Sequence, residues 1–209
     1  MNAPVNFAQP GQSAPATAAP TRPLAMPADF AGFDQWLRDG ADVPGGQWSP
    51  VRVLPTGPAN PGLMILSDVP DPSDMDAARL FSGPSGRLLD AMLGAIGLTR
   101  DDVRTGSIAV TRPIGGRLEG VELPALLEMA RHHIRLVQPA ALLILGQQSC
   151  KILAGSNIPA QAEPLRDVNH IDAKTVAFAM HHPRMLIERP LLKRPAWAVL
   201  KCLKELRRA

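Results

Sequence analysis

Four short, unbroken apolar runs constrain the fold of this chain more than any other feature of its sequence. They are GLMIL (62–66), SIAV (107–110), AALLIL (140–145) and TVAFA (175–179). Runs of this length without polar alternation are typical of strands that are covered on both faces, as in parallel sheets. The sequence therefore predicts four buried strands in one mostly parallel sheet.

Helical segments with one apolar face separate these runs. The segment after the first run predicts a helix with Ser85 as its N-cap and Gly97 as its stop. His132 and His133 fall in the middle of the next helix, where we expect structural roles, and the last helix is predicted to begin near Pro195. Its inward residues are predicted to be Val199, Leu200, Leu203 and Leu206. Alternating strands and helices predict a three-layer α/β/α domain with a central four-stranded sheet.

The first 61 residues differ from the rest. Residues 1–28 are mostly Ala, Pro and small polar residues, so we predict a disordered tail with too little apolar surface to order itself. Residues 29–61 predict a short helix with Phe33, Trp36 and Leu37 inward, followed by a connecting loop rich in Gly and Pro. The α/β domain is expected over residues 62–209.

The composition indicates the cellular compartment in which this chain is expected. The two cysteines, Cys150 and Cys202, are too few for a disulfide framework or a four-cysteine metal site, so we predict buried thiols. No apolar run approaches the roughly 20 residues of a membrane span, and the N-terminus lacks a signal-peptide core. A cytoplasmic monomer without a membrane partner is the prediction. The basic C-terminal segment is either a solvated helix face or a footprint for phosphate.

Polar, turn-rich segments follow all four predicted strands. SDVPDPSD follows the first, TRPIGGR the second, GQQS the third and HHPR the fourth. Open parallel sheets bind ligands beyond the carboxyl ends of their strands, so a site is expected where these loops meet. Asp68, Asp71 and Asp74 could serve such a site or simply cap a turn or helix. Pro183 holds His182 extended past the strand end, either as a site residue or merely exposed.

These motifs, in this order, resemble those of the uracil-DNA glycosylase superfamily. The matching stretches are LSDVPDPSD, FSGPSGRLLDAML, SIAVTRP, RLVQPAALLILG and HHPRMLIERPLLKRPAW. The resemblance runs from about Gly62 to Leu206 and is closest to the family 4 (iron–sulfur) branch. It implies a uracil-DNA glycosylase-like α/β domain that acts on DNA. The implied reaction is hydrolysis of the glycosidic bond of uracil, or of another deaminated base, flipped out of the helix.

The resemblance also implies roles for particular residues. Asp68 would activate or place the attacking water, and His182 would hydrogen-bond the uracil oxygen and stabilise the negative charge of the leaving base. Phe81 would stack on the base, with Pro70 in the first-strand motif and Ser107 at the position that reads the uracil edge. The residues that would contact DNA, by phosphate contacts and an apolar wedge, are Arg112, Arg184, Met185 and Leu186.

Several positions depart from the pattern of the family. Thr111 stands where the iron–sulfur branch has one cysteine, and the cysteine expected in the following helix falls near Leu126. The N-terminal cysteine pair is absent, so the chain cannot hold that cluster. Asp71 replaces the second glycine of the first-strand motif, and Arg184 replaces the usual serine after His-Pro. Ser107 offers one rotating hydroxyl where the family has an amide with both donor and acceptor, which predicts weaker base discrimination.

Three hypotheses of function follow. The first, which we favour, is a DNA glycosylase that uses Asp68, Phe81 and His182 and needs no metal or other cofactor. The second is a catalytically degenerate module that keeps the fold and binds DNA or a nucleotide without cleavage; Ser107 and Asp71 favour it. The third is an α/β protein for small molecules with no DNA role, and salt-dependent DNA binding would separate it from the first two.

Overall fold

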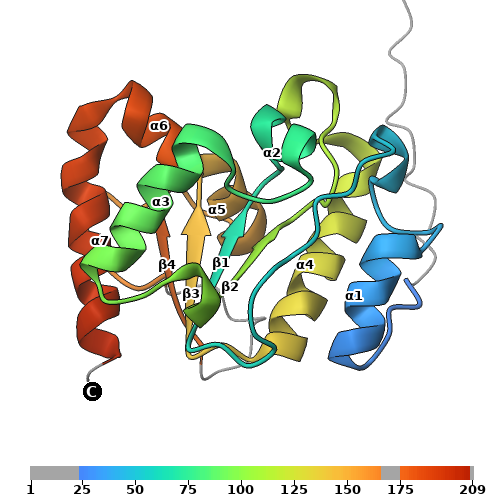
Figure 1. Cartoon of the computed structure of the whole chain (residues 1–209), viewed down its shortest axis with the longest axis horizontal. Coiled ribbons are helices and arrows are strands. Elements are labelled where there is room, and N and C mark those ends of the chain that lie inside the picture. Colours follow the sequence, from blue (N-terminus) through green and yellow to red (C-terminus); the bar gives the residue numbers. More distant parts are fainter. Residues whose placement is uncertain (1–23, 166–174, 208–209) are drawn as a thin grey trace, which may run out of the picture.

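The computed structural model describes residues 24–165 and 175–207, so residues 1–23 of the predicted tail lie outside it. At its centre is a four-stranded sheet with the order β2-β1-β3-β4, in which every neighbouring pair is parallel (Figure 1). The strands are β1 (Leu63–Ser67), β2 (Val103–Ser107), β3 (Ala141–Leu145) and β4 (Val176–Met180). The predicted parallel α/β sheet is confirmed.

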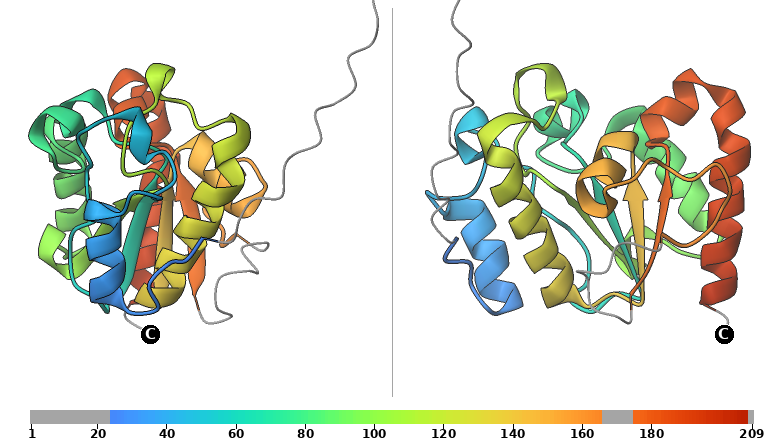
Figure 2. Two further views of the ribbon diagram at one scale, coloured as in Figure 1. Left: turned by 90° about the vertical axis from the view of Figure 1, so that its right-hand side faces the viewer. Right: turned by 180° about the vertical axis from the view of Figure 1, so that it is seen from behind.

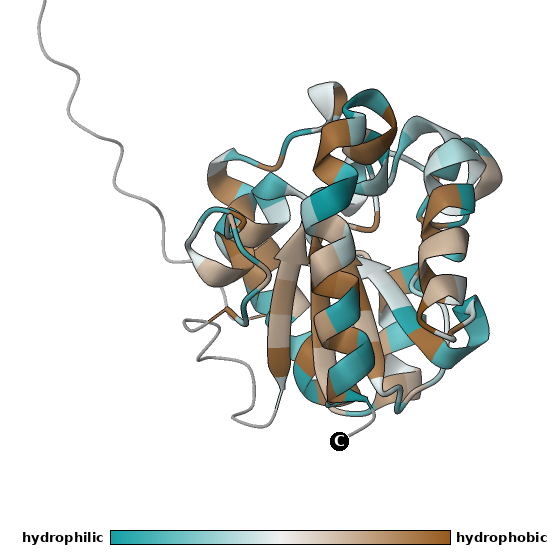
Figure 3. Cartoon of the chain, turned by 90° about the vertical axis from the view of Figure 1, so that its left-hand side faces the viewer, coloured by the Kyte–Doolittle hydropathy of each residue, from teal (hydrophilic) through white to brown (hydrophobic). Residues whose placement is uncertain are grey.

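Helices cover both faces of the sheet, which makes the three predicted layers (Figures 1 and 2). One face packs against α1 (Phe30–Asp39), α4 (Leu123–Val137) and α5 (Gln147–Ala154). The other face packs against α3 (Gly83–Ala95) and α7 (Lys193–Leu206). Successive strand residues point to opposite faces, so Leu63 and Ile65 join the second layer while Met64 and Leu66 join the first. Figure 3 shows the mostly apolar strands behind α7.

Strand β2 begins four residues earlier than the sequence predicts. Of the apolar run 107–110, only Ser107 belongs to the strand, and the other three residues are buried just beyond it. The strand itself contains Arg104, which is 2% exposed and broke the apolar pattern. Its guanidinium pairs with Asp34 on α1 and donates to the Gly57 carbonyl oxygen at 3.1 Å. The buried charge of Arg104 is tolerated inside the sheet because a carboxylate and a carbonyl oxygen are bonded to it there.

His133 completes this buried network from α4. Its Nε2 atom accepts a hydrogen bond of 3.3 Å from Nε of Arg104. Burial lowers the pKa of His133 to about 3, with smaller contributions from the nearby charges of Arg104 and His132. The imidazole is therefore neutral at physiological pH, and its role is structural, as the mid-helix position suggested.

Two helix boundaries also differ from the predictions. The N-cap of α3 is Ser82, and Ser85 lies buried within the first turn. Helix α7 begins at Lys193, two residues before the predicted start, and its final residue Leu206 is 37% exposed instead of buried. Helix α1 follows the prediction more closely, since Phe33 and Leu37 are buried and Trp36 packs partly against the same layer.

The basic C-terminal helix ends away from the carboxyl edge of the sheet (Figure 1). Lys204 donates to the Ala95 carbonyl oxygen at 3.3 Å, and Arg207 donates to that of Ile96 at 3.4 Å. Both carbonyl oxygens lie at the C-terminal end of α3, where the helix dipole favours cationic side chains. Of the two interpretations, a helix face with structural contacts fits this end of α7 better than a phosphate footprint.

Short bonded segments lie along both edge strands. Thr56 exchanges two backbone hydrogen bonds with Thr105 of β2, of 2.9 and 2.8 Å. On the other side, the Leu165 N–H donates to the Ala177 carbonyl oxygen of β4 at 2.8 Å. In the part of the chain described here, no helix is long and apolar enough to cross a membrane.

Candidate active site

The loops after all four strands converge on one cavity of about 470 Å³ at the carboxyl edge of the sheet. Asp68 follows β1, Arg112 and Arg117 follow β2, Gln148 follows β3, and His182 follows β4; all of them line this cavity. The convergence predicted from the sequence is present. Cationic side chains outnumber anionic ones on its walls, since Lys151 and Arg184 also line it.

His182 is the N-cap of α6 (Pro183–Glu188) and is buried. Its Nδ1 atom accepts a hydrogen bond of 3.3 Å from the Arg184 N–H, so the neutral ring carries its proton on Nε2. Burial lowers the pKa of His182 below its ordinary value, although the carboxylates of Asp71 and Asp68 oppose that shift. The site thus holds a neutral imidazole with an N–H available as a donor.

Phe81 lies directly against His182. The two rings stack with their centroids 5.8 Å apart and their planes at 25°. Phe81 is buried and has a φ of 53°, in the left-handed region that bulky residues rarely adopt. Such backbone conformations persist only where the surrounding structure enforces them, and they are frequent at functional sites.

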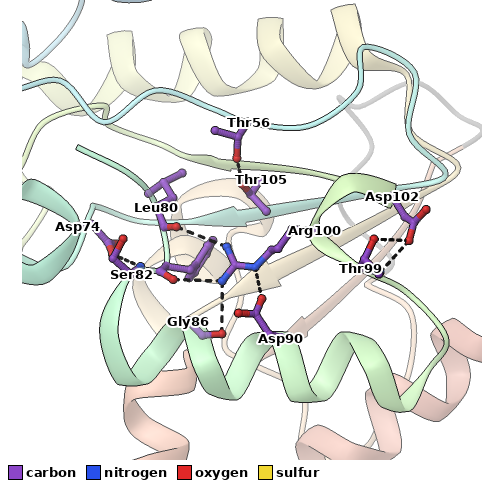
Figure 4. A network of polar contacts seen from close by, with 11 residues as sticks. Thr56, Asp74, Leu80, Ser82, Gly86, Asp90, Thr99, Arg100, Asp102 and Thr105 are labelled. Carbon is purple, nitrogen blue, oxygen red and sulfur yellow. Dashed lines mark hydrogen bonds and ion pairs between the residues drawn. The ribbon is translucent and has the colours of Figure 1, made fainter. Parts of the chain in front are cut away.

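Arg100, in the 3-10 turn η2 (Arg100–Asp102), holds the Phe81 segment in place (Figure 4). Its guanidinium pairs with Asp90 and lies 5.4 Å from the centre of the Phe81 ring. It donates to three backbone carbonyl oxygens at 3.1 to 3.4 Å, those of Leu80, Phe81 and Gly86. Asp74 holds the residue after Phe81, because its Oδ1 atom accepts a 2.6 Å hydrogen bond from the Ser82 N–H. Nothing in the sequence pattern pointed to Arg100.

The three aspartates after β1 divide into two roles. Asp71 is the N-cap of α2 (Pro72–Ala77), and its N–H donates to Oδ2 of Asp74 at 3.0 Å, as in a capping box. Burial raises the pKa of Asp74, although backbone N–H groups oppose that shift. Asp68 is different: it lines the cavity, and its Oδ1 atom accepts from the Val69 N–H at 2.9 Å. The capping interpretation holds for Asp71 and Asp74, which leaves Asp68 as the cavity carboxylate.

Asp71 also forms an ion pair with Arg184. The Asp71 side chain is 7% exposed and the Arg184 side chain 41% exposed, so the pair lies at the boundary between core and solvent. The hydroxyl of Ser85 donates to the second Asp71 oxygen at 3.2 Å. The two departures from the family motifs on the first and fourth strand loops therefore compensate each other directly.

Three other predicted residues are engaged with backbone groups. The Ser107 hydroxyl is buried and donates to the Ala109 carbonyl oxygen at 2.7 Å. Pro70 is buried, and its carbonyl oxygen accepts a 2.6 Å hydrogen bond from Nη1 of Arg112. Arg112 lines the cavity and ties the first-strand loop to the second.

Of the two residues predicted to form an apolar wedge, Leu186 is buried and Met185 is not. Leu186 is 1% exposed and packs in the core layer that contains α3 and α7. It lies on the inward face of α6, because His182 and Pro183 start that helix immediately after the strand. Met185 is half-buried and lines the cavity.

The residues at the two identified cluster positions do not fit an iron–sulfur group. The Thr111 hydroxyl is fully buried and donates to the Gly45 carbonyl oxygen at 2.6 Å, while Leu126 is a core residue. Cys150 is buried in one core layer, where burial raises its pKa, and Cys202 packs against the other. Among the residues that the structure describes, no group of three His, Cys, Asp or Glu side chains could hold a metal ion.

The chain has an open parallel α/β sheet with a cavity beyond the carboxyl ends of its strands, which is where proteins of this class bind ligands. The family model of the uracil DNA glycosylase superfamily matches residues 54–207, and the chain belongs to this superfamily. It is 29% identical over 140 residues to a type-4 uracil-DNA glycosylase of Pyrobaculum aerophilum, a match that covers 63% of this chain and 71% of that protein. The predicted resemblance is confirmed, and the superfamily acts on DNA in base excision.

Proposed function

We propose that this protein excises uracil, or another deaminated base, from DNA by hydrolysing the N-glycosidic bond. The observation that supports the proposal best is the placement of Asp68 and a neutral His182 on the walls of one cavity. A carboxylate and a hydrogen-bond donor are the two groups that this reaction needs, one for the water and one for the departing base.

In the proposed reaction, Asp68 holds the attacking water and accepts its proton. The glycosidic bond breaks, its electron pair leaves with the base, and the water oxygen bonds to the sugar carbon. His182 donates from Nε2 to a carbonyl oxygen of the base, where the negative charge develops. The imidazole must be neutral to leave that charge on the base, and the lowered pKa of His182 supports this state.

Phe81 contributes through His182 in this conformation. Its ring is buried against the imidazole and is not part of the cavity wall, so stacking on a base would require the two rings to separate. We propose that Phe81 positions the donor. The cationic walls would receive the DNA backbone, with Arg117 and Lys151 as phosphate contacts.

An alkali-cleavage assay on oligonucleotides that contain uracil, hypoxanthine or xanthine tests the proposal. The wild type should give strand breaks with at least one base. Asp68→Asn and His182→Ala should each lower the rate by roughly 100-fold or more. Asp76→Asn, at an exposed position on α2, is the matched control and should keep wild-type activity.

The second candidate is a binding module without cleavage. Two observations favour it: the Ser107 hydroxyl is committed to a backbone carbonyl, and Asp71 and Arg184 occupy the space of two small family residues. Salt-dependent DNA binding without strand breaks on any substrate would establish this alternative and overturn the enzyme. The absence of both binding and cleavage would favour the small-molecule hypothesis.

A further inference from the structure

An ion pair joins the loop after β1 to the first turn of α6, next to His182. Asp71 and Arg184 form this pair, and the Ser85 hydroxyl donates to the second carboxylate oxygen of Asp71 at 3.2 Å. Asp71 is also the N-cap of α2, and its side chain is 7% exposed. The carboxylate is therefore a fixed anchor, and the more exposed Arg184 side chain is the part of the pair that it holds.

The backbone of Arg184 contacts the imidazole directly. Its N–H donates to Nδ1 of His182 at 3.3 Å, which is long for a hydrogen bond, so the contact depends on how firmly Arg184 is held. A neutral imidazole that accepts at Nδ1 carries its proton on Nε2. Among the described residues Nε2 has no hydrogen-bond partner, and no fully buried side-chain nitrogen lacks one, so this N–H faces the open cavity.

The charges around His182 decide whether Nδ1 stays an acceptor. Burial is the largest influence and lowers the pKa of His182. The carboxylates of Asp71, Asp68 and Asp74 raise this pKa, whereas the guanidinium of Arg184 lowers it. Protonation of Nδ1 would turn the acceptor into a second donor and break the bond from Arg184. The other charged side chains on the cavity walls are Arg112, Arg117 and Lys151.

We propose that Asp71 and Arg184 are positioning residues: their ion pair holds the Arg184 N–H against Nδ1 of His182, so that Nε2 stays the donor that faces the leaving base. The inference rests on the proposed function for the base that receives this bond. A glycine and a serine are usual at these two positions in the family motifs, and such residues cannot form an ion pair. The arrangement therefore belongs to the residues of this chain.

The pH dependence of the excision rate tests the proposal, because the two halves of the pair should shift it in opposite directions. In Arg184→Gln the Asp71 carboxylate loses its cation, so the pKa of His182 should rise. Activity should then fall on acidification about one pH unit earlier than in the wild type. In Asp71→Asn the guanidinium remains, and the fall should begin at lower pH. Both variants should lose about tenfold in rate at neutral pH, since the donor is less well oriented.

Two further variants separate positioning from a general loss of structure. Arg184→Lys keeps the charge and should retain most of the rate and the wild-type pH profile. Arg79→Gln removes an exposed cation between α2 and α3 and is the matched control, which should leave both unchanged. Shifts of the pH profile in the same direction for Asp71→Asn and Arg184→Gln would overturn the proposal.

A second readout works without cleavage. The ¹⁵N chemical shifts of histidine rings report which nitrogen carries the proton, and the His182 signals are those missing from His182→Ala. The wild type should show the Nε2–H form, and Arg184→Gln a mixture of both forms. If the wild type cleaves no substrate, the proposed enzyme fails, and these spectra still decide whether the pair controls His182. Identical ring spectra in the wild type and Arg184→Gln would refute the positioning role.

Discussion

Replacing Arg184 by serine should destabilise the protein more than replacing Asp71 by glycine, although the two residues form one ion pair. The asymmetry comes from their surroundings. Without Arg184, a carboxylate that is 7% exposed keeps only the Ser85 hydroxyl as its side-chain partner. Without Asp71, the Arg184 side chain is already 41% exposed and can turn into water.

The magnitudes follow from this burial. Breaking a fully buried pair costs about 3–5 kcal/mol, whereas an exposed pair contributes about 1 kcal/mol or less. Arg184 is partly solvated, so we expect about 2 kcal/mol for Arg184→Ser. Asp71→Gly should cost about 1 kcal/mol, which includes a few tenths for the weaker N-cap of α2.

The double variant, which restores the small residues of the family motifs, should be no less stable than Arg184→Ser alone. The coupling between the two sites should be about 1–2 kcal/mol. Urea unfolding of all four proteins measures it, and Arg184→Ser should lower Tm by about 4–8 °C. Strictly additive effects, or a larger loss for Asp71→Gly than for Arg184→Ser, would refute the argument.

The remaining predictions concern the scaffold around the site. Between pH 7 and pH 5 the wild type should lose about 2 kcal/mol through His133, because the unfolded histidine gains a proton below about pH 6.5 while the folded one, with a pKa of about 3, does not. That figure is 1.5 pH units at about 1.36 kcal/mol each, and urea unfolding of His133→Gln at both pH values should lack this part of the slope. Gly86→Ala should destabilise by about 1–3 kcal/mol, since its Cβ atom would lie 1.6 Å from the Phe81 carbonyl oxygen. Gly94→Ala, in the same helix with open space around it, should be neutral or slightly stabilising, and a similar Tm change in both variants would contradict this account.

The fold could be predicted from the sequence wherever burial was local. Three of the four strands lie within one residue of the predicted runs, because their side chains are apolar on both faces. Strand β2 was misplaced because Arg104 is compensated by Asp34 and His133, which are distant in sequence. A propensity pattern has no access to a partner 70 positions away.

The site residues divide in the same way, into those that the local sequence predicts and those that distant contacts decide. Asp68 and His182 were predicted together because parallel strands bring their ends to one edge. The pairing of Asp71 with Arg184 was not predicted, since it joins loops 113 residues apart and depends on side-chain direction. Leu186 was assigned to the surface by its motif position, while the direction in which α6 leaves the strand decided its burial.

The segments bonded to the two edge strands have a consequence for the behaviour of the protein in a crowded solution. An open strand edge is a template on which another molecule can add its own strand, the first step of many aggregation pathways. The backbone bonds of Thr56 and Leu165 occupy part of that template on both sides of the sheet. Protection against intermolecular strand addition therefore comes in part from two short connecting segments that contribute no residue to the proposed chemistry.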